Sequence, residues 1–319
     1  MEKVFLPEFK SNELARLGDS AVLDAPTGRL AFTTDSYVVR PLFFRGGDIG
    51  RLAVSGTVND LAVAGAEPVA LSLGLIVEEG FLIEDLRRVA RSVASTAREA
   101  GTRIAAADTK VVERGAADGL FLNTSGVGRV REGADVRPER VEPGDAILVT
   151  GSLGDHGVAV LSEREGIAFE SAVESDVSPL ASLLLPLLDE SPGEIHMMRD
   201  PTRGGLAAAL NEIAASARAC VAVREKDIPV RPAVRGACDL LGLDPLTVAY
   251  EGKAVIFCAA SAAGRVLEQL RAHPLGRETA VIGEAASIDE DAPLVEVVTA
   301  LGTSRVLAMP YGEELPRIC

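Results

Sequence analysis

Four aspartates stand out as candidate metal ligands, because each lies among apolar or small residues where a carboxylate is costly. They are Asp35, Asp60, Asp108 and Asp200. A buried carboxylate needs a compensating charge, and Mg²⁺ bound to phosphate oxygens is a common source of it. Aspartate is also frequent at helix starts and strand ends, so capping and turn roles stay open for all four.

Two motifs offer contacts for a phosphate group. Asp108 and Lys110 lie two apart in an expected strand and so share a face, where one could hold a metal and the other a phosphate. An exposed ion pair is the alternative. The run Arg199–Gly205 precedes an expected helix, where Arg203 and free backbone N–H groups could meet an anion. The alternative there is a glycine-rich helix start capped by Thr202.

Cys319, the last residue, is a candidate carrier of a reacting group. The stretch from Pro310 onward has no helical or strand periodicity and could extend about 30 Å, so its thiol could enter a site like a swinging arm. Arg317 favours the thiolate and the terminal carboxylate opposes it. A chance exposed thiol is the alternative. We expect the other three cysteines to pack as buried apolar side chains in a reducing cytosol.

Composition excludes several classes of protein. The chain has 319 residues, 47% of them hydrophobic, and a net charge of -15, which argues against a nucleic-acid or anionic-membrane partner. The longest apolar-rich segment, 254–263, is too short to span a bilayer, and no leader-like pattern stands at the start. P-loop, dinucleotide-binding and zincin motifs are also absent. We therefore expect a soluble cytoplasmic protein that holds any phosphate ligand locally.

Helix and strand signals alternate along the chain, which predicts an α/β (α+β) fold in two domains. We expect strands at 30–39, 69–77, 103–112, 120–124, 146–150, 219–223, 254–259 and 280–282, with a hairpin at 295–308. We expect helices at 48–64, 83–100, 155–164, 180–188, 204–217, 233–241 and 262–272. Turn residues after Pro138 place the domain boundary near 140, giving domains 1–139 and 140–308 and a mobile tail 309–319.

Taken together, these motifs resemble the HypE family of hydrogenase maturation factors. The matching runs are Thr34–Val39, Phe43–Gly50, Gly56–Ala62, Asp108–Val112, His196–Leu206 and Leu315–Cys319. The ending is specific to that family. The aspartate motifs resemble the wider superfamily of aminoimidazole ribonucleotide synthetase and selenophosphate synthetase.

The resemblance implies a two-domain PurM-like fold, with an N-terminal β-sheet domain that carries helices and forms a homodimer, and a C-terminal α/β domain. It also implies Mg-ATP as ligand, with the four aspartates as metal positions. The nucleotide positions that it implies are Asp35, Asn59, Asp60, Asp108, Thr109, Lys110, Asp200 and Arg203.

A reaction is implied as well. A carbamoyltransferase, HypF, would place a carboxamide on Cys319, and ATP would drive its dehydration to a thiocyanate. The cyano group would pass to the HypC–HypD complex, for the iron of a [NiFe]-hydrogenase. Lys110 and Mg²⁺ would offset charge on the transferring phosphoryl group, and Glu251 is our candidate base for the nitrogen protons. A turn carboxylate paired with Lys253 is the alternative for Glu251.

Three features depart from the family pattern. The family usually carries a glycine-rich segment before the part that starts here at Val4, and we expect weaker ATP use if that segment normally closes over the nucleotide. Ala107 replaces a usual glycine, and Tyr250 stands where asparagine is common. Two other functions stay open: phosphorylation of a free small molecule with a structural tail, or an ATP-binding scaffold whose tail docks a partner. Deletion of Cys319 separates the small-molecule enzyme from the dehydratase.

Overall fold

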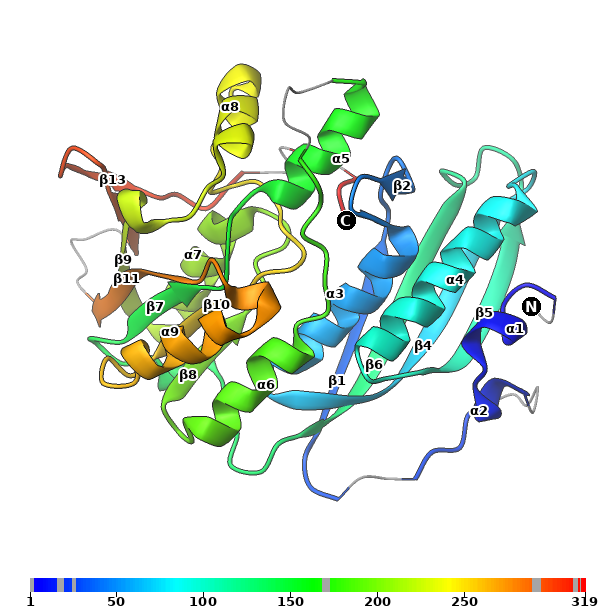
Figure 1. Cartoon of the computed structure of the whole chain (residues 1–319), viewed down its shortest axis with the longest axis horizontal. Helices are drawn as coiled ribbons and strands as arrows, with labels where there is room; N and C mark the ends of the chain where they lie inside the picture. Colours follow the sequence, from blue (N-terminus) through cyan, green and yellow to red (C-terminus); the bar gives the residue numbers. More distant parts are fainter. Residues whose placement is uncertain are drawn as a thin grey trace.

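The computed structural model describes residues 3–15, 20–24, 27–167, 173–288, 294–311, 315 and 317–319. Two sheets organise them, one formed by strands between residues 30 and 130 and the other by strands between 146 and 306. Helices accompany both sheets, and the two halves lie side by side (Figure 1). Each half therefore combines a sheet with helices, as the alternating pattern predicts.

The first sheet has helices on one face only. Its strands, in spatial order, are β1 (Leu30–Tyr37), β6 (Leu120–Val130), β4 (Ala66–Glu78) and β5 (Ile104–Val112). Helices α3 (Ile49–Val63) and α4 (Ile83–Glu99) cover one face, while α1 (Leu6–Phe9) and α2 (Asn12–Ala15) lie beside α4 and β5 (Figure 1). The hairpin β2 (Phe43–Phe44) and β3 (Gly47–Asp48) precedes α3. Strands β1 and β5 thus form the two edges.

Helix α3 is buried on almost every side, between the first sheet and the second half of the chain. Asp48 caps it by accepting hydrogen bonds from the N–H groups of Gly50 and Arg51. A Cβ atom at Gly126 of β6 would meet Thr57 of α3 at 2.8 Å, so a glycine is needed where helix and strand approach. That glycine weakens the strand signal, which explains why the expected strand 120–124 is too short.

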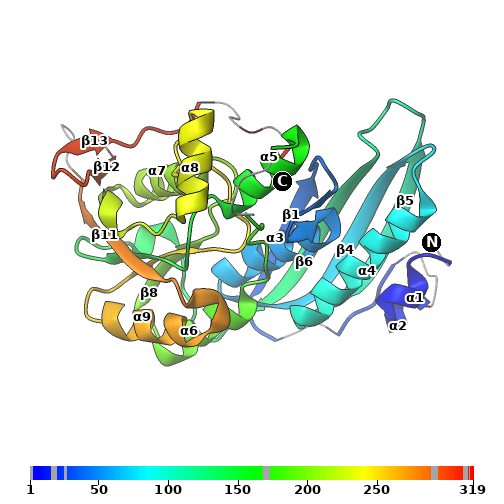
Figure 2. The ribbon, with the colours of Figure 1, turned by 45° about the horizontal axis from the view of Figure 1, so that its top comes forward.

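The second sheet is mixed and covered on both faces. Its strands, in spatial order, are β13 (Ser304–Val306), β12 (Val295–Val298), β9 (Ala219–Arg224), β11 (Ala280–Ser287), β7 (Ala146–Val149), β10 (Val255–Cys258) and β8 (Ile195–Arg199). Helices α6 (Ala181–Glu190) and α9 (Ala263–Ala272) cover one face and α7 (Gly205–Ala217) the other, while α5 (Asp155–Glu165) and α8 (Pro232–Leu241) lie near the tail end of the chain (Figure 2). The sequence did not indicate β8, because Ile-His-Met-Met-Arg has no alternation and the strand is buried on both sides.

A close crossing of two segments fixes the junction between the halves. A Cβ atom at Gly252 would lie 1.8 Å from the carbonyl oxygen of Asp176 and 3.1 Å from the backbone nitrogen of Ser178. Only glycine leaves room for the two backbones there. The hydrophobic core is continuous across the junction, since Leu61 of α3 and Leu184 of α6 belong to one cluster. The position of the 251–253 segment is therefore set by packing.

Gly252→Ala should lower the free energy of unfolding by about 2–4 kcal/mol, because either the 176–178 or the 251–253 segment must move. Urea denaturation measures this. The matched control is Gly236→Ala on α8, where nothing lies within 4 Å of the added atom, and a stabilising change of up to about 1 kcal/mol is expected. Equal stabilities for the two variants would contradict the crossing.

Candidate active site around the terminal cysteine

The end of the tail is docked against both halves of the chain. A terminal carboxylate oxygen of Cys319 accepts a hydrogen bond from the N–H of Val38 at 3.4 Å, and the carbonyl oxygen of Ile318 is 2.8 Å from Nε2 of His156 on α5. Figures 1 and 2 place the C-terminus beside β2, α3 and α5. Mobility of the tail stays a prediction, but its described end has a defined place in this structure.

The thiol of Cys319 lies between a carboxyl group and a guanidinium group. Both groups lie close enough to the side chain of Cys319 to shift the pKa of its thiol. Burial raises the pKa of Cys319 far above its usual value, the charge of Glu251 raises it further, and Arg203 acts in the opposite direction. The free thiol is therefore protonated at neutral pH when it is docked.

Glu251 is a buried carboxyl group among like charges. It is 3% exposed, and its Oε1 atom has no hydrogen-bond partner among the described residues. Burial raises the pKa of Glu251 well above its usual value, and Asp200, Asp176 and Asp35 raise it further. A carboxyl group with a raised pKa and one unoccupied oxygen, in contact with the terminal sulfur, is placed to exchange protons with a group carried on that sulfur.

The loop before α7 brings Arg203 to the thiol and Asp200 to Glu251. Gly204 and Gly205 have φ angles of 76° and 58°, which favour glycine, and a Cβ atom at Gly205 would lie 2.7 Å from the carbonyl oxygens of Leu246 and Val248. The glycines therefore serve close packing. Burial, followed by the charge of Asp60, raises the pKa of Asp200 to about 7.

Three of the predicted metal ligands influence one another. Asp60 on α3 accepts a hydrogen bond from Thr33 at 2.7 Å, and its pKa is raised by burial and by Asp35 on β1. Asp60 and Asp35 in turn raise the pKa of Asp200. Among the described residues no three His, Cys, Asp or Glu side chains converge as a complete ligand set. Mg²⁺ needs only one or two carboxylates when phosphate and water supply the rest, so this donor set fits it.

Asp108, Thr109 and Lys110 lie at the opposite edge of the sheet. The register places Asp35 in one row with Thr124, Leu73 and Ala107, so Asp108 on β5 is three strands away from β1. Strand spacing makes this about 14 Å. Asp108 and Lys110 are exposed on the face that the helices leave open, while Thr109 faces the other way. One chain does not bring this motif together with Asp35, and its roles stay predictions.

Asn59 has its side chain engaged within the chain. Its amide nitrogen donates to the carbonyl oxygens of Ser178 at 3.1 Å and Glu251 at 3.3 Å, and its Oδ1 accepts from the N–H of Leu180 at 2.7 Å. These bonds tie α3 to the second half of the chain. The structure thus shows Asn59 in contact with the segment that carries Glu251, and a nucleotide contact stays a prediction.

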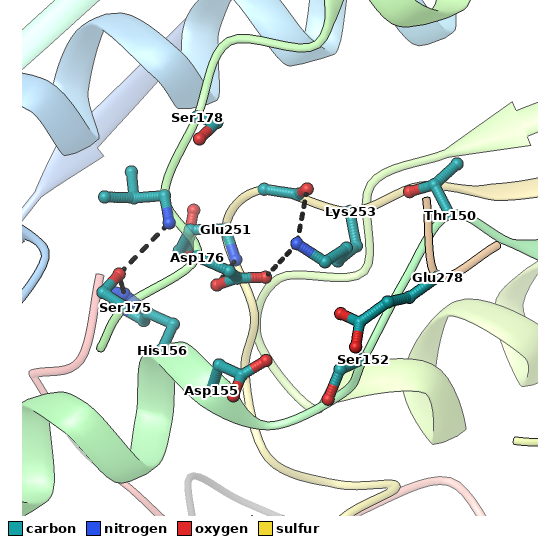
Figure 3. Close-up of polar contacts among 12 residues, drawn as sticks. Thr150, Ser152, Asp155, His156, Ser175, Asp176, Ser178, Glu251, Lys253 and Glu278 are labelled. Atoms are coloured by element: carbon teal, nitrogen blue, oxygen red, sulfur yellow. Dashed lines mark hydrogen bonds and ion pairs between the residues drawn. The ribbon is translucent and has the colours of Figure 1, made fainter. Parts of the chain in front are cut away.

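Sequence reasoning missed a buried ionic cluster beside Glu251. Asp155 on α5, Asp176 and Lys253 lie together in Figure 3. Lys253 Nζ is 3.3 Å from Oδ2 of Asp176, and Asp176 Oδ1 accepts from the N–H of Glu251 at 3.2 Å. Burial, followed by the charge of Asp176, raises the pKa of Asp155 to about 6, while Arg231 and Lys253 lower it. The only signal was the run of two ionisable residues between Gly154 and Gly157.

His156, which the sequence also left without a role, holds the tail. Burial lowers its pKa, so the ring is neutral at pH 7. Its Nδ1 is 2.8 Å from Oγ of Ser175, and that Oγ accepts from the N–H of Val177 at 3.2 Å (Figure 3). The carbonyl oxygen of Ile318 can only accept, so the one N–H of the neutral ring is on Nε2, and Nδ1 accepts from the Ser175 hydroxyl.

Two family models match the chain. The N-terminal domain of AIR synthase related protein matches residues 17–130, and its C-terminal domain matches residues 142–293. Together with the structural match below, these confirm the expected two-domain α/β fold of that superfamily.

Full-length relatives agree. Carbamoyl dehydratase HypE from Bradyrhizobium diazoefficiens is 51% identical over 316 residues, which cover 99% of this chain and 91% of that protein. A crystal structure of the hydrogenase maturation protein HypE in complex with ATP is 48% identical with a TM-score of 0.95, covering 100% of this chain and 95% of that one. A crystal structure of a HypE–HypF complex is 43% identical with a TM-score of 0.85, covering 97% and 99%.

The buried Asp155 should make stability fall as pH rises. Its pKa is raised from 3.8 to about 6 in the folded chain, so the folded state binds this proton more tightly than the unfolded state. Stability from this group is complete below pH 3.8 and is lost as pH rises through about 6. Urea denaturation should show that Asp155→Asn gains up to about 3 kcal/mol on the parent between about pH 4 and pH 8. Identical pH dependence of the two proteins would contradict this.

Proposed function

Because this chain belongs to the HypE family of carbamoyl dehydratases, we propose that it uses ATP to dehydrate a carboxamide carried on its own Cys319. The product is a thiocyanate on the same sulfur, which supplies the cyanide ligand for the iron of a [NiFe]-hydrogenase during maturation. The observation that carries this proposal is the contact of the terminal thiol with Glu251 and Arg203 in one chain. A merely structural tail would not need its last side chain beside a buried carboxyl group and a guanidinium group.

The chemistry requires that the carboxamide oxygen become a good leaving group. The oxygen attacks the γ-phosphorus of ATP, and the bond from that phosphorus to ADP breaks. The two nitrogen protons and inorganic phosphate then leave, and the carbon–nitrogen triple bond forms. One proton ends on phosphate and the other reaches solvent at neutral pH, so thiocarboxamide and ATP give thiocyanate, ADP, phosphate and a proton.

Each residue beside the sulfur has a role in these reaction steps. Glu251 accepts a nitrogen proton, because its carboxyl group is in contact with the sulfur and its raised pKa makes the carboxylate a stronger base. Arg203 donates toward charge that develops on the carboxamide oxygen. Backbone bonds to Val38 and His156 hold the tail while this happens.

The acidic cluster of Asp35, Asp60 and Asp200 is the proposed place for the nucleotide phosphates. Asp35, Asp60 and Asp200 would hold Mg²⁺, which when bound offsets negative charge on the phosphate oxygens. The similar HypE crystal structure contains ATP, which supports ATP as the substrate here. The proposal that Mg²⁺ binds here is supported by the carboxylate side chains alone.

The carboxamide must be added outside the pocket. The docked thiol is protonated and lies beside Glu251 and Arg203, so it is a poor nucleophile there. We propose a HypF carbamoyltransferase as donor, because a similar protein forms a complex with HypF. The HypC–HypD complex as cyano acceptor rests on the family resemblance.

A homodimer through the open sheet face is part of the proposal. That face carries the exposed apolar residues Leu30, Phe32 and Ile76, which are 54%, 72% and 43% exposed. Exposed apolar faces of this kind mark interaction surfaces. A two-fold axis along the strands would place β5 of one copy opposite β1 of the other, so Asp108 and Lys110 would approach the edge that carries Asp35.

A cytoplasmic location is also part of the proposal. Among the helices of the described residues, none combines the length and apolar character needed to cross a bilayer. The cysteines that the structure describes are all free. Reduced thiols are typical of the cytoplasm, which is the proposed location.

Glu251→Gln tests the assigned base. The variant should accept a carboxamide on Cys319 normally and then dehydrate it at least about 100-fold more slowly, since a positioned base contributes that much or more. Mass spectrometry of the C-terminal peptide follows both steps. Glu268→Gln, an exposed glutamate on α9, is the control and should match the parent. Parent-like dehydration by Glu251→Gln would remove Glu251 from the mechanism.

Phe32→Arg tests the dimer. A charged side chain on the apolar face, in place of its most exposed aromatic residue, should convert the dimer to monomers, as measured by sedimentation. The matched control is Leu301→Arg, because Leu301 is 93% exposed and lies after β12, away from that face. A monomeric parent, or a dimer that survives Phe32→Arg, would rule out this interface.

A further inference from the structure

The docked tail is held by contacts that resemble peptide recognition. The carbonyl oxygen of Arg317 accepts from the N–H of Arg40 at 3.1 Å, and a terminal carboxylate oxygen of Cys319 accepts from the N–H of Val38 at 3.4 Å. Residues two apart in the tail thus pair with residues two apart after β1, in reverse order. Backbone hydrogen bonds in this antiparallel order are one of the ways in which proteins hold a peptide.

Ile318 contributes a buried side chain and a hydrogen-bonded carbonyl oxygen to the docking of the tail. Ile318 is 3% exposed and belongs to the main hydrophobic cluster. Its carbonyl oxygen accepts from His156, whose ring is held by Ser175 and by edge contact with Phe44. A charged or small residue in place of Ile318 would lose this pocket.

The side chain of Arg317 is recognised by an opposite charge. Its guanidinium forms an ion pair with Asp118, in the loop before β6, at 2.7 Å, and its carbonyl oxygen also accepts from Arg164 of α5 at 2.6 Å. Arg317 has a φ of 57°, a conformation that costs an L-residue about 1 kcal/mol. The ion pair thus helps to hold a strained backbone in place.

These contacts come from residues far from the tail in sequence, so the covalent link adds only local concentration. We propose that the groove formed by Val38–Arg40, Asp118, His156 and Arg164 is a binding site for peptides ending in Arg-Ile-Cys, and that it accepts the terminus of a separate molecule. Asp118 discriminates among such termini by pairing with the arginine. The binding site stands on the contacts alone, while processing of the bound peptide rests on the proposed function.

The test uses the full-length chain with its own tail expelled. Ile318→Asp replaces a buried side chain by a carboxylate and vacates the groove. A labelled peptide of the last seven residues, Glu-Glu-Leu-Pro-Arg-Ile-Cys, should bind it saturably by fluorescence anisotropy. Binding to the parent should be weaker, because its own tail competes. Thermal denaturation checks that the variant folds.

A charge exchange isolates the role of Asp118. Adding Asp118→Arg to the emptied chain, or Arg317→Asp to the peptide, should weaken binding roughly two- to fivefold, as expected for a partly exposed ion pair. Combining the two changes should restore it, which loss of structure would not do. Glu268→Arg makes the same charge change on α9 and should leave binding unchanged.

The outcomes separate the groove from the chemistry. Absence of saturable binding, or failure of the charge exchange to restore it, overturns the groove even if the parent dehydrates its own tail. Binding of a carbamoylated peptide with ATP-dependent conversion to the thiocyanate, seen by mass spectrometry, supports both. Binding without conversion upholds the groove and counts against the proposed dehydration.

Discussion

Glu251 is buried with the carboxylates of Asp200, Asp176 and Asp35 close enough to raise its pKa, and much of the surrounding structure compensates for that burial. Burial and the repulsion between these like charges both favour its protonated form, so neutralising a neighbour lowers its pKa. The same repulsion would make its carboxylate a strong base. Proton transfer at the terminal sulfur and the charge state of the acidic cluster are therefore coupled.

Both halves of the chain contribute to this compensation. Lys253 pairs with Asp176, Arg203 lies at the sulfur, and Asn59 accepts and donates backbone hydrogen bonds across the junction. The close backbone crossing at Gly252 fixes the distance between the segments that carry Asp176 and Glu251. Rigid packing thus holds groups whose charges would otherwise drive them apart, which is the arrangement expected of a preorganised site.

Local signals in the sequence predicted much of the fold. Apolar periodicity and glycine stops placed α4 and α7 to within a residue of their ends, and the pattern of β-branched residues located β1. Strand β8 escaped, because a strand buried on both sides has no alternation. The length of β6 was underestimated, because its glycines weaken the strand signal and are required by the close packing of α3 against the strand.

The sequence predicted only those site residues whose type and surroundings are unusual in themselves. A terminal cysteine and aspartates among small residues are conspicuous, and the resemblance pointed to Glu251. The structure brings Cys319, Glu251 and Arg203 together. Asp118, His156 and Asp176 act through partners more than 70 residues away in the chain, so no spacing reveals them. Asn59 belongs to a recognisable motif, but that motif does not indicate which backbone groups its side chain binds.

The central claim is that ATP activates the oxygen of a carboxamide carried on Cys319. The most direct measurement is to place on the parent chain a carboxamide that contains a heavy oxygen isotope, add ATP and Mg²⁺, and analyse the inorganic phosphate by mass spectrometry. The account predicts that the heavy oxygen appears in phosphate in step with thiocyanate on Cys319. Heavy oxygen in water, with thiocyanate formed all the same, would contradict it.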